Sequence, residues 1–456
     1  MKNVKLWLIL SVCIFIILPL ILIFPVKLEG EKPSVSLDLK FPSIGASKEI
    51  SVSVSDTRSG IRRVWIGLLK GDREYLLLEK DFPSKGLLGG KKVTEESFKI
   101  SVDPKKSGIL DGKAVLFIIA RDYSWRGWWN GNKTLIEKEV MIDTKRPGID
   151  VLNNVLNISQ GGSGVVIYKL SEPCASNGVH VGENFFPGYS AKDVIGSKEA
   201  NIFMSLIALD YKQGPETDIF VKATDHAGNI TSAGFRYYVK GKKFREDSIN
   251  ISDKFLNWKM PEFESHIQDS QSSRVEQFLM INDKLRKSNY QTFAELGRKS
   301  DNILYWKGSF LRFPGKRMAG FADHRKYKYN GKTIDRQVHM GIDIASVSKA
   351  EVPASNNGKV VLAKYLGIYG KSVMIDHGFG LFTTYSHLSR INVKEGQIVS
   401  RGEIVGNTGL TGLAGGDHLH FGVLVSNIFV NPIEWWDSHW IKDNVSDKIN
   451  EIKSLR

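Results

Sequence analysis

The 456-residue sequence is poor in cysteine, which limits how the protein can be held together. Only Cys13 and Cys174 are present, and Cys13 lies within an uncharged apolar run. No intramolecular disulfide is therefore expected, and folding must rely on hydrophobic cores. Nucleic-acid motifs are absent too, and the basic residues behind the formal net charge of +14 are scattered, so we expect no nucleic-acid partner. The length allows about three domains.

A long apolar run without charge extends from residue 6 to residue 26. Because about 20 apolar residues span a bilayer core, we predict a cytoplasmic stub and transmembrane helix, acting as an anchor, over residues 1–28. Lys2 and Lys5 place the N-terminus in the cytoplasm. The alternative is a cleaved signal peptide, whose apolar core normally has only about 7–15 residues and ends at a small-residue site. We therefore predict a single-pass protein of the inner (cytoplasmic) membrane, with the remainder periplasmic or otherwise extracytoplasmic.

The next part of the chain has the short alternating pattern of β-strands. Residues 50–55 alternate with period two, and two longer apolar runs end in the same way, at Ala120-Arg121-Asp122 and Ala223-Thr224-Asp225. These signals predict a mainly β chain with two β-sandwich-like modules, residues 30–145 and 147–242. The modules resemble the immunoglobulin-like modules of bacterial envelope proteins.

Three tryptophans, Trp125, Trp128 and Trp129, cluster just after the first long apolar strand. Their aromatic faces suit stacking on sugars. Packing against a neighbouring domain is the commoner use of large aromatic side chains, so both interpretations stay open.

Residues 243–300 change to apolar residues near helical spacing, and Ser273 and Glu276 have the spacing of a capping box. We predict a helical linker here, which braces or covers the domain that follows. That domain is expected over residues 301–440, with a C-terminal tail over residues 441–456.

Histidine is also scarce, and four of the ten histidines gather in three short segments near the C-terminus. His339 precedes Asp343 by four residues, His387 ends a β-prone run, and His418 precedes His420 by two. Residues two apart on a strand point to the same face, so strands could bring these groups together. Imidazole and carboxylate groups suit Zn²⁺, and two His with one Asp leave a position for water, as in catalytic sites. The pattern predicts a hydrolase.

Around these motifs, residues 315–436 resemble the M23 (lysostaphin or LytM-type) zinc metallopeptidases, which cut peptide bonds in bacterial peptidoglycan. The order and spacing of all matching segments agree: they are residues 339–345, 358–361, 369–378, 385–389, 399–406, 409–412, 417–421 and 430–432. Two places depart from the family pattern, residues 349–353 and Asp417, where members often carry Pro. A carboxylate at Asp417 can alter the pKa of His418 or the choice of substrate. His377 has a turn pattern and is interpreted as structural.

The resemblance implies that His339, Asp343 and His420 bind one Zn²⁺ and that His387 and His418 are the catalytic histidines. No H-E-x-x-H glutamate is present, so the histidines must exchange the proton of the attacking water. Which of the two is the general base stays open. The predicted function is a zinc metalloendopeptidase that cleaves cross-link or stem peptides of peptidoglycan.

Other functions fit the same sequence. A dormant M23-like domain could bind peptidoglycan or activate another wall hydrolase, but every ligand position is filled here. A zinc carboxypeptidase acting on another extracytoplasmic peptide is a further alternative. The bond that is cut stays open between D-alanyl-diaminopimelate cross-links and glycine bridges, and the predicted inner-membrane anchor favours the former. The basic surface suits attraction to anionic lipid and an anionic cell wall, or has no specific partner.

Overall fold

The computed structural model describes residues 27–83, 92–196, 200–267 and 271–454, together with the single positions 7 and 11. The chain forms two compact units: residues 1–147, 173–175 and 224–231 make up the first, and the remainder makes up the second. The predicted anchor lies almost entirely outside the described residues. Among the described residues, no helix has the length and apolar character needed to cross a membrane. The prediction of a mainly β chain is confirmed.

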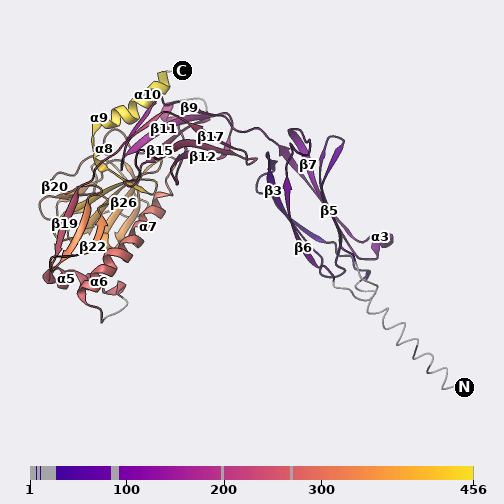
Figure 1. Cartoon of the computed structure of the whole chain (residues 1–456), viewed down its shortest axis with the longest axis horizontal. Coiled ribbons are helices and arrows are strands. Elements are labelled where there is room, and N and C mark those ends of the chain that lie inside the picture. Colours follow the sequence, from indigo (N-terminus) through magenta and orange to yellow (C-terminus); the bar gives the residue numbers. More distant parts are fainter. Residues whose placement is uncertain are drawn as a thin grey trace. The chain divides into compact units, whose positions relative to one another are not determined.

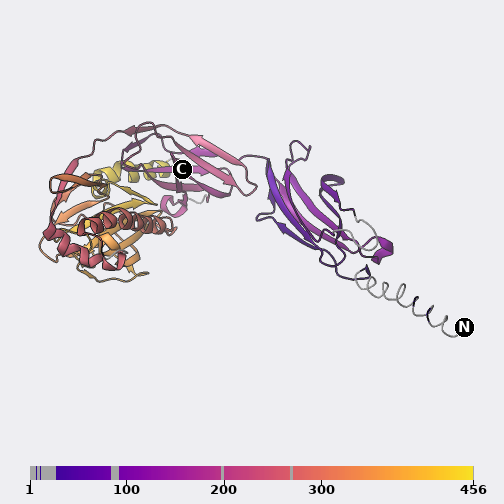
Figure 2. The ribbon, with the colours of Figure 1, turned by 60° about the horizontal axis from the view of Figure 1, so that its bottom comes forward.

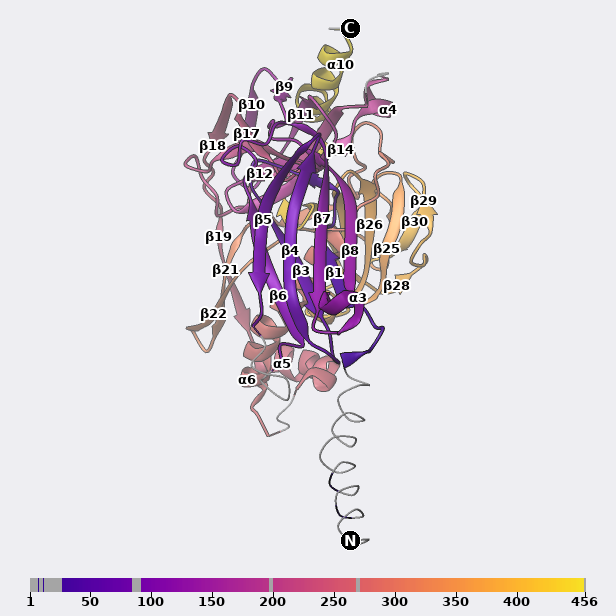
Figure 3. The ribbon, with the colours of Figure 1, turned by 90° about the vertical axis from the view of Figure 1, so that its right-hand side faces the viewer.

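Two sheets of the first unit enclose one hydrophobic core. Figure 3 shows the larger sheet in front, with β5, β4, β7 and β8 side by side. The smaller sheet has the order β1-β3-β6, with bounds Ser34–Asp38, Lys48–Ser55 and Glu95–Val102. The larger has the order β2-β8-β7-β4-β5, with bounds Ser43–Ile44, Lys133–Ile142, Gly112–Asp122, Ile61–Lys70 and Arg73–Asp81. In β3, Ile50, Val52 and Val54 are buried and alternate with half-buried serines, as predicted.

The strand ending that is repeated in the sequence has the same structure in both places. β7 ends at Asp122 and β16 (Ile219–Asp225) ends at Asp225. Each carboxylate accepts hydrogen bonds from the backbone N–H and the side-chain amide of one asparagine, Asn132 or Asn229. The repeat is therefore structural as well as sequential.

The tryptophan segment follows β7 as the short helix α3 (Arg126–Trp129). Trp128 is 94% exposed and Trp129 is 63% exposed, so neither side chain packs into a core. Both residues have positive φ angles, 56° and 71°.

The strands from β9 to β18, between residues 149 and 240, form two four-stranded sheets and a parallel pair. The orders are β14-β15-β11-β9, β13-β12-β16-β17 and β10-β18. The bounds of β9 to β15 are Ile149–Val151, Leu156–Ser159, Ser163–Leu170, Cys174–Val181, Asn184–Pro187, Tyr189–Ser190 and Ile202–Ala208, and those of β17 and β18 are Ile230–Gly234 and Tyr237–Lys240. A short helix, α4 (Lys192–Ile195), lies between β14 and β15.

The histidine motifs lie in a mostly antiparallel region built on an eight-stranded sheet. Its order is β20-β23-β31-β27-β26-β25-β29, with β32 paired to β31. The bounds in that order are Lys316–Ala319, Ile342–Ala345, Leu419–Val425, Leu381–Leu388, Lys371–Gly378, Gly358–Tyr365, Ile398–Val399 and Ile428–Val430. A smaller sheet joins β24 (Glu351–Pro353), β30 (Ile404–Asn407) and β28 (Arg390–Ile391). The short 3₁₀ helix η4 (Gly367–Tyr369) precedes β26, and α8 (Pro432–Trp436), α9 (Ser438–Ile441), η5 (Lys442–Ser446) and α10 (Asp447–Ser454) complete the described chain.

The segment predicted as a helical linker packs onto this region (Figures 1 and 2). It begins with a strand that the sequence did not indicate, β19 (Glu246–Ile251), which pairs in parallel with β21 (His324–Tyr329), the neighbour of β22 (Lys332–Val338). The predicted helices follow: α5 (Asp253–Lys259), η2 (Met260–His266), α6 (Arg274–Met280), η3 (Ile281–Leu285) and α7 (Arg286–Gly297). The predicted capping box is present at α6. Phe293 is fully buried, with its ring centroid 5.0 Å from that of Tyr369, so this segment is part of the core.

Candidate metal centre and active-site groove

Neighbouring strands bring the predicted metal ligands together. β23 and β31 pair so that Asp343 lies directly opposite His420. β27 pairs with the other side of β31, with Ser386 opposite His420, so His387 comes to the same end of the sheet. His339 lies between β22 and β23, and His418 immediately precedes β31. The strand assignment made from the sequence is confirmed for Asp343, His387 and His420.

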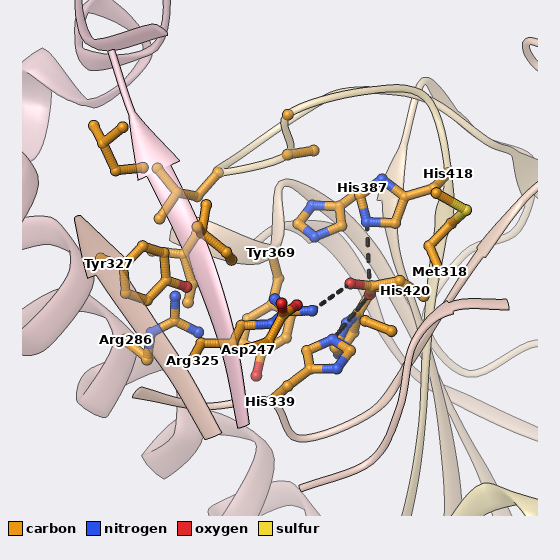
Figure 4. Close-up of a pocket in the computed structure, with 18 of the residues that line it drawn as sticks. Asp247, Arg286, Met318, Arg325, Tyr327, His339, Tyr369, His387, His418 and His420 are labelled. Carbon is orange, nitrogen blue, oxygen red and sulfur yellow. Dashed lines mark hydrogen bonds and ion pairs between the residues drawn. The ribbon is translucent and has the colours of Figure 1, made fainter. Parts of the chain in front are cut away.

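Three ligand atoms meet at one point (Figure 4). Asp343 Oδ1 is 2.9 Å from His339 Nε2 and 2.9 Å from His420 Nδ1, and these two nitrogens are 3.0 Å apart. All three side chains are buried, and together they could hold a metal ion.

The tautomer of His339 shows why this cluster needs a cation. His339 Nδ1 lies 2.7 Å from the carbonyl oxygen of Gly320, which can only accept, so Nδ1 carries the N–H. A neutral His339 therefore directs the lone pair of Nε2 at the Asp343 carboxylate oxygen. Lone pairs that face one another in a buried site repel unless a metal ion or a proton lies between them.

Gly341 allows the His420 ring to lie in this cluster. A Cβ atom at residue 341 would lie 2.6 Å from both Cε1 and Nε2 of His420 and 2.7 Å from the Phe421 carbonyl oxygen. Such contacts are too short, so any larger residue at this position would displace the ring. Close packing against the His420 ring therefore explains the glycine between His339 and Asp343.

His387 and His418 stand beside the cluster, with ring centroids 4.9 Å apart. His387 Nδ1 faces the Thr411 carbonyl at 2.9 Å, and His418 Nδ1 faces the Gly416 carbonyl at 2.8 Å. Both rings thus carry the N–H on Nδ1, which leaves the lone pair on Nε2 when the ring is neutral. His387 also has a φ of 63°, a strained conformation for a residue with a Cβ, of the kind that clusters at functional sites.

The environment moves the pKa values of these groups in opposite directions. Burial lowers the pKa of His387 well below its usual range, and His418 and His420 add to that shift. Burial also lowers the pKa of His420, to about 4. Burial alone would lower the pKa of His418. The Asp343 carboxylate, 3.6 Å from Nε2, outweighs burial and raises this pKa above its ordinary value. Burial would raise the pKa of Asp343, but the facing histidines hold it well below the usual range.

The cluster lies in a groove of about 470 Å³ that all five predicted residues line. Residues from β19 and from the helices line the same groove, among them Asp247, Phe255 and Arg286. Arg325 on β21 donates to Asp343 Oδ2 at 2.8 Å, and this contact leaves Oδ1 directed at the histidines (Figure 4). Sequence reasoning missed Arg325, because its charged strand carries no motif. Tyr369 also lines the groove. It lies within a segment that matches the family pattern, but the sequence did not indicate a role for it.

Two other predictions concern residues near the motifs. Asp417 accepts from Ser348 Oγ and the Lys349 N–H, both at 3.2 Å, so the carboxylate that acts on His418 is Asp343. His377 is structural as expected, but it lies on β26 rather than in a turn. Its ring is fully buried and bonds to the Asn357 carbonyl at 2.7 Å and to Thr383 Oγ1 at 2.8 Å.

Comparison with known proteins gives this region a family. Residues 337–432 match peptidase family M23. The chain is 35% identical to the peptidoglycan DD-endopeptidase ShyB of Vibrio cholerae over 32% of its own length and 35% of that protein's. It is 39% identical to the DD-carboxypeptidase/endopeptidase Mpg of Neisseria meningitidis over 21% of its own length and 22% of that protein's. The matched part thus spans about a third or less of these relatives.

Among solved structures, the catalytic domain of the antimicrobial peptidase lysostaphin from Staphylococcus simulans is 29% identical. The match covers 27% of this chain and 92% of that one, with a TM-score of 0.23. The family match confirms the resemblance seen in the motifs: the C-terminal part of this chain carries a peptidase family M23 domain.

Proposed function

We propose that this protein is a zinc metallopeptidase that hydrolyses peptide bonds in bacterial peptidoglycan. One observation carries the proposal: the ligand atoms of His339, Asp343 and His420 converge within 3.0 Å of one another, beside two further histidines in a groove. The names of the relatives support peptidoglycan as the substrate, and the DD-endopeptidase relatives favour its peptide cross-links over its stem peptides.

The ligand set fits zinc. Zn–N and Zn–O bonds of about 2.0–2.1 Å place neighbouring tetrahedral ligands about 3.3 Å apart. The three atoms lie 2.9–3.0 Å apart, so a shift of a few tenths of an ångström would accommodate the ion. Two neutral imidazoles and one carboxylate are a donor set that this ion prefers. When bound, zinc supplies Lewis acidity, which lowers the pKa of a water molecule and polarises the scissile carbonyl.

The two remaining histidines have distinct roles in this proposal. His387 is kept neutral by burial, and the Thr411 carbonyl holds its proton on Nδ1, so Nε2 is free to take a proton from the attacking water. His418 Nε2 faces the cluster, 3.6 Å from Asp343 Oδ1, so a proton on this nitrogen would be directed toward the oxygen on which negative charge develops. His387 is therefore assigned as the general base and His418 as the stabilising donor.

Incubation of the purified zinc-loaded chain with isolated sacculi tests the function, with mass spectrometry of the released fragments. We expect cross-linked dimers to fall and monomeric muropeptides to rise. Release of single terminal D-alanine residues with cross-links intact would instead indicate a carboxypeptidase. A protein that binds sacculi without releasing any fragment would identify a dormant domain.

We also propose that residues 1–28 anchor the enzyme in the cytoplasmic membrane with its catalytic domain outside, on the charge and length of the apolar run. An alkaline phosphatase fusion after Leu28 should be active in cells, and the same fusion without residues 6–26 should be inactive. If the fusion that keeps residues 6–26 were inactive, the proposed orientation of the anchor would be wrong.

A further inference from the structure

Three carboxylates gather at one end of the first unit, far in sequence from the peptidase motifs. Glu29 precedes β1, Asp56 follows β3 and Asp122 ends β7, so they connect the incoming chain with both sheets. Each offers an oxygen within 4.8 Å of the others. The three residues are only 5%, 7% and 0% exposed.

Hydrogen bonds from the protein satisfy only part of this cluster. Asp122 accepts from the N–H groups of Ser124 and Asn132 and from the Asn132 amide. Asp56 Oδ1 accepts from the Arg58 and Gly60 N–H groups. Glu29 Oε1 accepts from the Ser59 N–H at 3.0 Å. Backbone donors position the carboxylates but leave their negative charges close together.

Among the residues that the structure describes, none donates a hydrogen bond to the second oxygen of Glu29, although this side chain is completely buried. The nearest cationic group is Arg58, whose Nε lies 3.9 Å from Oε2. The Arg58 side chain is 55% exposed, and its shorter ion pair, 3.0 Å, is with the exposed carboxylate of Glu31. Lys27 directs its ammonium group at the Tyr123 ring, 5.7 Å from the centroid. Neither basic side chain lies within hydrogen-bond distance of this Glu29 oxygen.

A buried, unpartnered carboxylate oxygen is costly unless a cation binds it. Burial raises the pKa of Glu29, hydrogen bonding from Ser59 lowers it, and repulsion from Asp56 and Asp122 raises it further. The donors are all oxygens, which excludes a preference for zinc and favours a hard cation. Mg²⁺ demands octahedral geometry and retains waters, whereas Ca²⁺ accepts several carboxylates in irregular arrangements.

We infer that Glu29, Asp56 and Asp122 form a Ca²⁺ site that fastens the start of the first module to its two sheets. The Glu29 carbonyl also accepts from Ser124 Oγ and from the Asn132 amide, at 3.1 and 3.2 Å. The site therefore also holds both ends of the loop that carries the exposed tryptophans. Its role is structural and is independent of the peptidase.

Calorimetric titration of CaCl₂ into the zinc-loaded full chain in detergent, after removal of other divalent ions, tests the inference. We expect binding with a Kd on the order of 10⁻⁴–10⁻³ M, the range of extracellular calcium modules, and weaker binding of MgCl₂. Glu29→Gln should weaken this binding by about tenfold or more, because it removes a charged ligand. Glu31→Gln is the matched control: it removes the same charge from an exposed side chain two residues from Glu29, and should leave the Kd unchanged.

Asp56→Asn provides a second variant should Glu29→Gln perturb folding, which the circular dichroism spectrum reports. Calcium should also raise the unfolding temperature of the wild type and the Glu31→Gln variant, but not of Glu29→Gln. No Ca²⁺ binding by the wild type up to about 10 mM, ten times the weakest expected Kd, would overturn the site. Equal binding by Glu29→Gln and wild type, or equal weakening by Glu29→Gln and Glu31→Gln, would do the same.

Discussion

At the scale of single residues, the candidate metal centre brings together atoms whose lone pairs repel one another unless a metal ion or a proton lies between them. His339 and Asp343 illustrate this, since the Gly320 carbonyl keeps the proton of His339 on the far side of its ring. The sequence motifs were sufficient to find these residues, because their spacing follows from a turn and from strand pairing. The motifs could not show the tautomers, which depend on carbonyl groups from other parts of the chain.

Replacing any one of His339, Asp343 and His420 with Ala should abolish zinc retention, because two protein ligands leave an inadequate site. Metal analysis of the purified variants by mass spectrometry measures this directly. Gln291→Ala, a change at an exposed position of α7, serves as the control and should retain one zinc per chain. Full zinc occupancy in His420→Ala would contradict the ligand set.

His387→Ala and His418→Ala should retain zinc but lose activity on sacculi by about 10²–10⁴-fold, the usual contribution of general acid–base groups. Rates of fragment release at matched zinc content provide the measurement. If His387 is the base, its loss should also remove the acidic limb of the pH–rate profile, whereas loss of His418 should remove the basic limb. A wild-type rate in either variant would exclude its proposed role.

Arg325 is a positioning residue that lies outside the sequence motifs. Its guanidinium bonds to Asp343 Oδ2 from a strand of another sheet, so only the folded chain shows the contact. Groups that orient metal ligands typically contribute about 10–100-fold to metal affinity, and we expect a loss of that size for Arg325→Gln. Competition with a zinc chelator measures the affinity, with the exposed Arg317→Gln as control. Equal affinities would show that Asp343 is oriented without Arg325.

At the scale of elements, the sequence predicted whether a segment is a helix or a strand better than it predicted which elements contact one another. Helices α5, α6 and α7 lie within the segment predicted to be helical, and the capping box marks the start of α6. β19 was missed because Glu246–Ile251 is short and largely polar, and it becomes a strand through pairing with β21. This segment packs into the core, since Phe278 and Phe293 are fully buried and Asn289 accepts from the Ile368 N–H at 2.9 Å.

One contact between elements should make stability depend on pH. Glu434 on α8 accepts from Ser163 N–H and Oγ on β11, and burial raises its pKa to about 7. A raised carboxyl pKa means that the folded state holds the proton more tightly than the unfolded state. The contribution is therefore complete below the unfolded pKa of 4.5 and is lost as the pH rises through about 7.

Glu434→Gln, which keeps the hydrogen bonds from Ser163, should remove this loss. Between pH 4.5 and pH 8 the wild type should lose on the order of 3 kcal/mol of stability relative to the variant. Urea unfolding at several pH values measures the difference, and the exposed Glu351→Gln is the control. Parallel stability curves for wild type and Glu434→Gln would show that the carboxyl is ionised at little cost.

At the scale of the whole molecule, residues outside the family match line the groove around the candidate metal centre. The helical pattern before the peptidase motifs predicts that residues 245–300, or the first β module, restrict access to the zinc groove, with a plain spacer as the equal alternative. The structure makes residues 243–300 both a wall of the groove, through Asp247 and Phe255, and part of the core, through Phe293. A protein shortened to begin near Asp301 would therefore lose part of its core as well as the wall of the groove. A change in its rate of peptidoglycan hydrolysis could then come from either loss.

A point change separates the two roles. Phe255 lines the groove and is only half-buried, so Phe255→Ala should widen the groove while leaving the core of α7 intact. If this wall restricts bulky substrates, the variant should digest cross-linked sacculi faster than wild type, with little change for a short soluble muropeptide that does not reach the wall. Asn257→Ala, an exposed change on the same helix outside the groove lining, should match wild type on both substrates. Slower cleavage of both substrates by Phe255→Ala would instead make this wall a substrate-positioning surface, and equal rates would leave it a scaffold.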